Sequence, residues 1–288
     1  MLQDAFLELL RRAACDLPPD VEAALRQAYD REEAGQPAKS VFGTILENVV
    51  MAREASTPIC QDTGSINFYI DFPAGQREQD YCAAAEAAAA EGTKRTCLRP
   101  NAVNPITGKN SGNNVGVNAP FFHFHQWEEP YTRVRVMLKG GGSENVGAQY
   151  RLPDTSIGAG RDLKGIKKCI LDAVLKAQGF GCSPGAIGVG IGGDRMTSYL
   201  LSKEQFFRRL GSVNEDATLA QMETELYGKL NELNIGPMGF GGKTTVLGVH
   251  IGAQHRHPAT FFVAITYMCW AYRRKTMIIR DGEVRYED

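Results

Sequence analysis

The order of helical and strand patterns along the 288 residues is the feature that most restricts the fold. Apolar residues recur at intervals of three and four through the first 55 residues, which predicts a helical N-terminal cap. Strand and helix patterns then follow one another with no internal repeat and no Pro/Ser-rich linker. We therefore expect a single α+β domain over residues 1–288, with mixed β-sheets surrounded by helices. The predicted helices are 2–14, 21–33, 41–53, 78–91, 162–177, 203–210 and 219–233, and the predicted strands are 65–72, 132–139, 244–250, 261–266, 276–280 and 283–286.

Charge and hydropathy restrict the possible partners. The chain has 32 Lys+Arg against 33 Asp+Glu, so it lacks the surplus of cations that a dedicated nucleic-acid binder needs. Its longest nearly apolar stretch, 261–272, is much shorter than the roughly 20 residues of a membrane-spanning helix. The N-terminus reads as an amphipathic helix rather than a signal peptide. We expect a cytoplasmic protein that binds neither nucleic acid nor membrane.

Seven cysteines are present, and none forms a C-x-x-C pair, so a disulfide framework is not expected in a reducing compartment. Cys60 and Cys182 lie among turn-forming residues, whereas a structural cysteine normally lies on an apolar helix or strand face. Cys269 ends an apolar strand, where a core role is the simpler interpretation. Three widely spaced thiols of this kind fit an iron–sulfur cluster better than a zinc knuckle. The remaining cysteines are predicted to pack inertly on helices (Cys15, Cys82 and Cys169) or are undecided (Cys97).

Two glycine runs resemble nucleotide-binding motifs. The run Gly188–Gly193 satisfies G-x-G-x-x-G, with Asp216 at a suitable distance for a ribose contact. A nucleotide-binding protein is therefore the alternative of another class. Gly242-Lys243-Thr244 resembles the end of a P-loop, but the position of its first glycine is Pro237 and β-branched residues follow where a helix should begin. We exclude the P-loop and expect most of these glycines to serve tight turns and close backbone packing.

Several motifs together resemble a known family. In chain order they are PICQDTG, LRPNAVNPITGKN, KGGGSEN, the loop around Cys182 with GVGIGG after it, NIGPMGFGG with TTVLGVHI, and the segment 257–269. Over residues from about 41 to the C-terminus, the sequence resembles the α subunit or N-terminal domain of iron–sulfur hydro-lyases, namely class I fumarases and L-tartrate dehydratases. The pair CQDTG and GGGSEN is highly specific to that group.

The resemblance implies a [4Fe-4S] cluster held by Cys60, Cys182 and Cys269, with one iron left open as a Lewis acid. It also implies a substrate site containing Gln61 and Asp62 as catalytic residues. Three further residues would contact the substrate: Arg99, Gly141 and His257.

These residue types suit a dicarboxylate substrate. An arginine fork pairs with a carboxylate in a bidentate way that lysine cannot match. Asp62 could orient a base or accept the proton of the substrate hydroxyl. The simpler alternatives are a turn residue for Asp62, a solvated loop cation for Arg99 and a structural histidine for His257. The loop 96–118 that carries Arg99 is too long for a simple connector, and such loops are usually functional.

The reaction that the resemblance implies is reversible hydration of fumarate to L-malate. In the family, the base and several cationic residues lie in a second domain or β subunit. We therefore expect an α subunit whose active site a β subunit completes, in an α2β2-type assembly that dimerises through the α subunit. The segment from Cys269 to Arg274 resembles tartrate dehydratases more than fumarases, so an L-tartrate dehydratase α subunit is the alternative.

Overall fold

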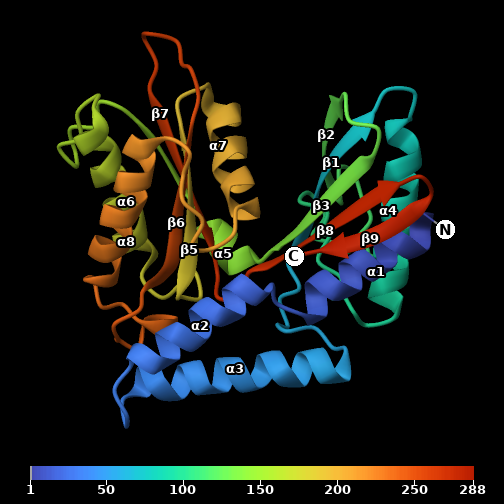
Figure 1. Ribbon diagram of the computed structural model, residues 1–288, viewed down its shortest axis with the longest axis horizontal. Coiled ribbons are helices and arrows are strands. Elements are labelled where there is room, and N and C mark those ends of the chain that lie inside the picture. Colours follow the sequence, from blue (N-terminus) through green and yellow to red (C-terminus); the bar gives the residue numbers. More distant parts are fainter. Residues whose placement is uncertain (1) are drawn as a thin grey trace. The chain divides into compact units, whose positions relative to one another are not determined.

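The structure is a computed structural model that describes residues 2–288, and Figure 1 shows its helices and strands. The chain groups into two compact units. Unit 1 comprises residues up to Pro19, Glu47–Gly141 and Arg273–Asp288, and unit 2 comprises Asp20–Leu46 and Gly142–Tyr272. The first 55 residues thus contribute to both units rather than forming a cap of their own. The expectation of one domain over the whole chain stays a prediction.

Unit 1 is built on a mixed five-stranded sheet with the strand order β2-β1-β3-β8-β9. β1 pairs in parallel with β2 and antiparallel with β3, which pairs antiparallel with β8. The strands are β1 (Ser65–Pro73), β2 (Phe121–Trp127), β3 (Thr132–Lys139), β8 (Arg273–Arg280) and β9 (Glu283–Glu287).

The core of unit 1 lies between this sheet and two helices, α1 (Leu2–Cys15) and α4 (Glu78–Lys94), which Figure 1 shows on the same side of the sheet. Phe6 of α1 meets Phe68 of β1 edge to face, with ring centroids 5.3 Å apart. Burial of one such side chain stabilises the fold by about 1.5–3 kcal/mol. Alanines on the buried face of α4, including Ala85 and Ala88, let α1 approach closely. The spacing of three and four that predicted α1 is therefore the spacing of its core contacts.

Unit 2 is built on a mixed four-stranded sheet with the order β4-β7-β5-β6. The helices α6 and α8 cover one face over a large apolar core, and α7 packs against the strands β5 and β7 (Figure 1). The bounds are α2 (Pro19–Arg31), α3 (Pro37–Ala55), α5 (Gly141–Asn145), β4 (Ala148–Arg151), α6 (Leu163–Ala177), β5 (Gly185–Ile191), α7 (Arg195–Glu204), α8 (Ala217–Asn231), β6 (Val246–Ala253) and β7 (Phe262–Met268); α2, α3 and α5 cross the unit boundaries.

Glycines in β5 allow α7 to lie against the strand. A Cβ atom at Gly190 would lie 2.0 Å from the carbonyl oxygen of Ser198, and one at Gly188 would lie 2.2 Å from that of Ser202. The N-terminus of α7 is already occupied, because the Asp194 carboxylate accepts a hydrogen bond of 2.7 Å from the N–H of Thr197. A phosphate would have to displace this carboxylate. The G-x-G-x-x-G run thus serves helix–strand packing, which disfavours the nucleotide-binding alternative.

The second glycine run leads into a strand, as the exclusion of a P-loop required. β6 begins at Val246, two residues after Thr244. The backbone N–H groups of Lys243 and Thr244 donate to the buried carboxylate of Glu32, at 2.9 and 3.1 Å. Protein groups therefore already bind the N–H donors that a P-loop would offer to phosphate.

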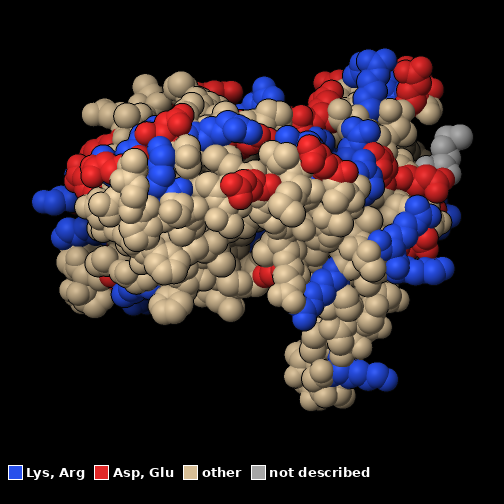
Figure 2. Space-filling view, turned by 90° about the horizontal axis from the view of Figure 1, so that it is seen from below, with Lys and Arg blue, Asp and Glu red and all other residues tan. Residues whose placement is uncertain are grey.

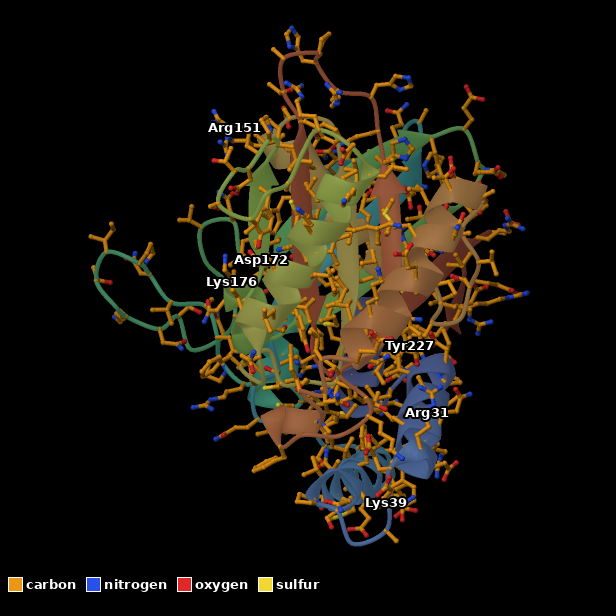
Figure 3. All side chains as sticks on the ribbon, turned by 90° about the vertical axis from the view of Figure 1, so that its left-hand side faces the viewer. Arg31, Lys39, Arg151, Asp172, Lys176 and Tyr227 are labelled. Atoms are coloured by element: carbon orange, nitrogen blue, oxygen red, sulfur yellow. The ribbon has the colours of Figure 1, made fainter. Side chains whose placement is uncertain are left out.

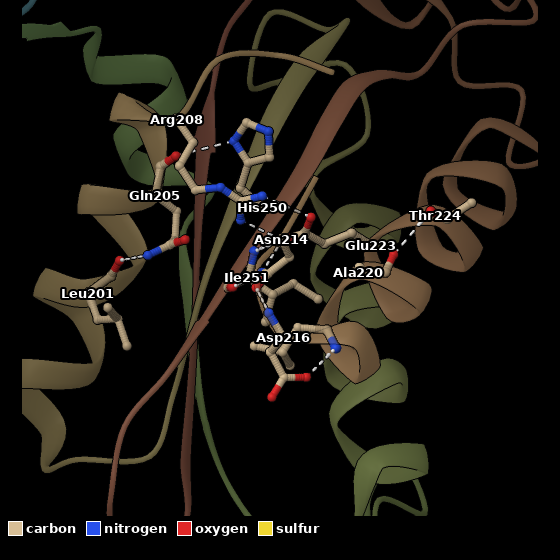
Figure 4. A network of polar contacts seen from close by, with 11 residues as sticks. Leu201, Gln205, Arg208, Asn214, Asp216, Ala220, Glu223, Thr224, His250 and Ile251 are labelled. Atoms are coloured by element: carbon tan, nitrogen blue, oxygen red, sulfur yellow. Dashed lines mark hydrogen bonds and ion pairs between the residues drawn. The ribbon is translucent and has the colours of Figure 1, made fainter. Parts of the chain in front are cut away.

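Polar contacts fix the helices of unit 2 to its edge strand. The buried Glu223 Oε1 of α8 accepts from Arg208 Nη1 at 2.6 Å, from Asn214 Nδ2 at 2.8 Å and from the N–H of Ile251 at 2.7 Å (Figure 4). The carboxylate of Glu223 thus provides a hydrogen-bond acceptor for the N–H of Ile251 on β6, which is an edge strand. Arg31 at the end of α2 donates to the Tyr227 hydroxyl of α8 at 2.7 Å, so a hydrogen bond joins these two helices (Figure 3).

Cationic and anionic side chains are intermixed on the face seen in Figure 2, in keeping with the net charge of −1. Among the helices of residues 2–288, none combines the length and the apolar character needed to cross a membrane.

The α+β class is confirmed, and most elements lie within a few residues of their predicted bounds. The predicted helix 203–210 is wrong, because α7 ends at Glu204 and a short 3₁₀ turn, Gln205–Phe207, follows. The missed signal was Asp194, an N-cap that starts the helix earlier. Three strands, β2, β4 and β5, were not predicted. β4 has only four residues, and β5 lies in the glycine run that was expected to serve turns and close packing. In β2, His123 and His125 alternate with the partly buried Phe122 and Phe124, which weakens its apolar pattern.

Candidate active site

The segment from Cys60 to Gly64 lies where three strand ends of unit 1 converge. In the sheet, Ser65 at the start of β1 pairs with Lys139 at the end of β3, and Leu138 pairs with Arg273 at the start of β8. Gly64 has φ +80°, and a Cβ atom there would lie 2.7–2.8 Å from the backbone of Lys139. Only glycine fits at this position. The convergence therefore places the Cys60 segment against the residues that follow β3.

Asp62 holds this arrangement through both carboxylate oxygens. Oδ1 accepts from the N–H of Gly64 at 2.9 Å, and Oδ2 accepts from the N–H of Gly141 at 2.7 Å. Asp62 therefore positions the backbone of the site, in addition to the role that the resemblance implies for it.

Arg99 is brought beside the same segment by Thr63. The hydroxyl oxygen of Thr63 accepts from the N–H of Arg99 and from Asn101 Nδ2, both at 3.0 Å. The guanidinium of Arg99 is exposed and makes no hydrogen bond or ion pair within residues 2–288. The structure thus gathers Gln61, Asp62, Arg99 and Gly141 in unit 1, with a cation that is available to an anionic ligand.

A residue that the sequence did not single out lies at the same place. Arg273 is only 1% exposed, and its Nη1 donates to the carbonyl oxygen of Asp62 at 2.7 Å. Its Nε is buried without a hydrogen-bond partner, and no carboxylate of the described chain pairs with it. A buried cation without an anion is costly. The available signal in the sequence was the pair of arginines that follows Cys269. Its resemblance to tartrate dehydratases does not by itself assign the two arginines a place in the site.

In unit 2, Cys182 and Cys269 lie on neighbouring segments. The carbonyl oxygen of Cys182 accepts from the N–H of Trp270 at 3.2 Å, and β5 and β7, which adjoin these cysteines, are paired. Cys182 is exposed and has φ +56°, a left-handed conformation that is uncommon for a residue with a side chain. Burial raises the pKa of the Tyr267 hydroxyl, and the nearby thiols of Cys269 and Cys182 raise it further. Both thiols therefore lie near one buried side chain.

The second glycine run supports the Cys182 loop. The N–H of Met238 donates to the carbonyl oxygen of Ser183 at 2.8 Å, and the Ser183 hydroxyl donates to that of Gly236 at 2.6 Å. A Cβ atom at Gly179 would lie 2.7 Å from the Met238 carbonyl oxygen. These glycines therefore allow two backbones to clamp together around a candidate ligand.

His257 lies elsewhere in unit 2. It belongs to the exposed connection between β6 and β7, and its Nδ1 accepts from the N–H of Ala259 at 3.1 Å. Cys182 precedes β5 and Cys269 follows β7, so His257 is at the opposite end of the sheet (Figure 1). Seven strand residues span about 23 Å. The role of His257 in substrate binding stays a prediction that this placement does not support.

The three cysteines assigned to helix packing lie in surroundings that disfavour the thiolate. Burial raises the pKa of the Cys15 thiol to about 11 and that of the Cys169 thiol to about 12. Burial also raises the pKa of Cys82, which is only partly exposed. These thiols stay protonated near neutral pH, and a metal ligand must be a thiolate.

Within residues 2–288, no group of three or more His, Cys, Asp or Glu side chains is arranged as a metal site. The donor set nevertheless suits an iron–sulfur cluster, because such clusters take thiolate ligands and two candidate thiols are neighbours in unit 2. The buried guanidinium of Arg273 also suits an anionic cluster or substrate beside Asp62. The residues present therefore fit the group that the resemblance implies.

We expect Arg273→Met to stabilise the isolated chain. Removing an unpaired buried cation relieves its desolvation cost, which exceeds the roughly 1 kcal/mol of the lost hydrogen bond to Asp62. The urea concentration at half-unfolding should rise, and any activity to which the cation contributes should fall, because such a cation is retained for function rather than stability. A variant that unfolds at lower urea, as a merely structural arginine would, contradicts this expectation. Arg280→Met is the control, because Arg280 lies on the same strand but is exposed. It should leave the urea midpoint and the activity unchanged.

Taken together, the fold and this site define an α+β protein with two arginines, one exposed and one buried, beside a motif cysteine. A family model described as fumarate hydratase (fumerase) matches residues 3–278. The chain belongs to the fumarate hydratase family.

Individual relatives differ in how much of their length the chain covers. It is 49% identical over 276 residues to a putative fumarate hydratase class I of Geobacillus stearothermophilus, covering 95% of this chain and 54% of the relative. It is 35% identical over 279 residues to a putative L(+)-tartrate dehydratase subunit alpha of Methanocaldococcus jannaschii, covering 95% of each. It is 31% identical over 271 residues to the L(+)-tartrate dehydratase subunit alpha of Escherichia coli, covering 91% and 86%. The chain thus spans about half of the first relative and most of the other two.

Proposed function

We propose that this chain is the α subunit of a cytoplasmic [4Fe-4S] hydro-lyase that hydrates fumarate reversibly to L-malate. The observation that carries the proposal is the 49% identity to a putative fumarate hydratase class I across 95% of the chain. The motif segment around Asp62, with an unoccupied guanidinium on Arg99 and a buried one on Arg273, supports a dianionic substrate.

Cys60, Cys182 and Cys269 are the proposed cluster ligands. When bound, a cluster with three protein thiolates supplies an open iron that acts as a Lewis acid toward the substrate hydroxyl. Cys60 belongs to unit 1, and Cys182 and Cys269 belong to unit 2. The hydrogen bonds from Ser183 to Gly236 and from Met238 to Ser183 support the loop in which the backbone of Cys182 is left-handed.

The residues of unit 1 would bind and orient the substrate. Arg99 offers a planar fork to one carboxylate. Gln61 is exposed beside Asp62 and offers an amide to a substrate oxygen. Asp62, held by two backbone donors, would accept a hydrogen bond from the substrate hydroxyl and so orient it for departure. Gly141, the remaining proposed substrate residue, lies at the same place because its N–H donates to Asp62 Oδ2 at 2.7 Å.

A β subunit would complete the active site and supply the base that removes the proton from carbon. Two relatives are named subunit alpha and match this chain over most of their length, whereas the longer relative has nearly as much chain again outside the match. We propose an α2β2-type assembly that dimerises through the α subunit. The small dicarboxylate is then bound by residues of both kinds of subunit.

L-Tartrate dehydration is the second candidate. The observation that favours it is the 35% identity to a putative L(+)-tartrate dehydratase subunit alpha with 95% of both chains covered, which matches in length as well as in sequence.

The test is anaerobic purification of the chain co-expressed with its β subunit, followed by iron and sulfide analysis and assays with fumarate and L-tartrate. We expect about four iron and four sulfide per α chain and a kcat/KM for fumarate at least about tenfold above that for L-tartrate, which is about 1.4 kcal/mol of transition-state stabilisation. The reverse ratio would establish the tartrate alternative. A colourless, iron-free protein without hydratase activity contradicts both.

A further inference from the structure

The segment from Pro100 to Phe121, here called the amide loop, has an unusual surface. Only one of its 22 residues is charged, Lys109, and six are asparagine. Two aliphatic side chains on it are almost fully exposed, Ile106 at 90% and Val117 at 97%. Figure 3 shows the loop as a teal ribbon that extends from its sheet, and the segment that projects downward in Figure 2 is mostly tan.

The loop is ordered by its own hydrogen bonds rather than by an apolar core. Asn104 Oδ1 accepts from the N–H groups of Ile106 and Thr107 at 2.9 and 3.0 Å, which forms the turn that presents Ile106. A second turn presents Val117, because Gly116 and Ala119 exchange backbone hydrogen bonds of 2.9 and 3.1 Å. Both apolar tips are therefore held in fixed positions. A surface that is ordered beforehand loses little conformational entropy on binding.

A cavity of about 650 Å³ lies within this surface. The amide loop forms most of its walls, and Ser65 and Ile66 of β1 complete it. Val117 and Pro105 line it as apolar walls, with Asn101 and Asn114 as polar ones. An interface hot spot typically places an apolar or aromatic side chain of one partner into such a pocket of the other.

These properties favour a protein partner. With one lysine, the loop cannot neutralise the phosphates of a nucleic acid. Depletion of charge around apolar and amide groups is instead the composition of the centre of a protein interface. Other exposed apolar side chains of the chain, such as Val213 at 81%, are not part of such an uncharged segment.

We propose that the amide loop is the docking surface for the β subunit, an inference that rests on the proposed function. The relatives point to the occupant: 95% of a protein named subunit alpha is matched by this chain, and a class I fumarate hydratase has only 54% of its length inside the match, so the rest is the kind of polypeptide that we propose is bound. The position of the loop supports this assignment. It begins directly after Arg99, whose N–H is bonded to Thr63 of the motif segment. A partner seated on the loop would lie beside the proposed substrate residues.

The test measures binding rather than catalysis. The probe is the polypeptide of the source genome that matches the part of the Geobacillus relative outside the present chain, co-expressed and purified with the α chain. Ile106→Asp and Val117→Asp should each weaken this complex at least about tenfold, because each buries a charge in the interface. Val213→Asp, an equally exposed aliphatic residue in unit 2, is the matched control and should bind like the wild type. All variants should keep the wild-type urea midpoint.

Equal binding by the wild type and both loop variants overturns the inference, as does a wild-type chain that does not bind the probe. It is also overturned if the loop variants abolish self-association of the α chain but not binding of the probe, since the occupant is then a second copy. Hydratase activity is recorded separately on the wild-type complex. Its absence contradicts the proposed function, whereas unaffected binding by the loop variants in an active complex contradicts only the docking surface.

Discussion

Replacing Cys60, Cys182 or Cys269 by serine should lower hydratase activity of the αβ complex by at least about a hundredfold. Loss of a group that merely orients a metal ligand already costs 10–100-fold, and a serine hydroxyl does not form the anion that iron requires. Iron and sulfide content after anaerobic purification should fall in parallel. The measurements are kcat with fumarate and the iron content per chain.

The matched control is Cys82→Ser. Cys82 is a partly exposed thiol on α4 whose pKa is raised by burial, and it is the cysteine of the helical group that is least enclosed. We expect its iron content and kcat to equal those of the wild type. Full iron content in any of the three ligand variants would remove that cysteine from the cluster. A loss of iron in the Cys82→Ser control would mean that serine substitution lowers the iron content without removing a ligand. The three cysteines could then not be assigned as ligands on this ground.

Gly64→Ala should unfold the chain more readily by about 3 kcal/mol or more. The left-handed φ of +80° costs an L-residue about 1–2 kcal/mol. The added Cβ atom would also lie 2.7–2.8 Å from the backbone of Lys139, which cannot move without shifting β3. The free energy of unfolding in urea measures the effect. The same shift should disturb the bonds from Gly64 and Gly141 to Asp62 and so lower activity.

Gly75→Ala separates the two contributions. Gly75 has nearly the same backbone conformation, φ +88°, but no atom lies within 4 Å of the position of its Cβ. We expect this variant to lose about 1 kcal/mol of unfolding free energy, which is the cost of the left-handed backbone conformation alone. Equal destabilisation by the two variants would show that the contact with Lys139 does not restrict the segment.

Local patterns were sufficient for most of the fold. The helix α1 and the strand β3 were predicted because one face of each is apolar at the period of its own backbone. The failures occurred where the pattern was weak or where a start signal was overlooked. β2 alternates histidine with phenylalanine, and the beginning of α7 depends on Asp194. In both cases a strand distant in sequence contacts the element: β1 pairs with β2, and β7 packs against α7.

The candidate site was predictable only in its composition. The motifs confirmed only the family; the three cysteines as ligands and the substrate site around Asp62 stay predictions. They did not reveal that Asp62 is bonded to Gly141, 79 positions away, or that Arg273 lies buried on the carbonyl oxygen of Asp62, 211 positions away. They also placed His257 with the other residues, whereas the β7 strand separates it from Cys269 within unit 2.

The sequence by itself determined the fold class, most helices and strands, the family and the residue types of the candidate site, because these depend on short-range periodicity and on the chemistry of individual side chains. Only the tertiary structure decided which groups meet. The end of β3 and the starts of β1 and β8 converge because of strand order and register, and these are fixed by how whole faces pack, not by any local segment. The buried cation of Arg273 and the exposed tips of the amide loop are consequences of that packing.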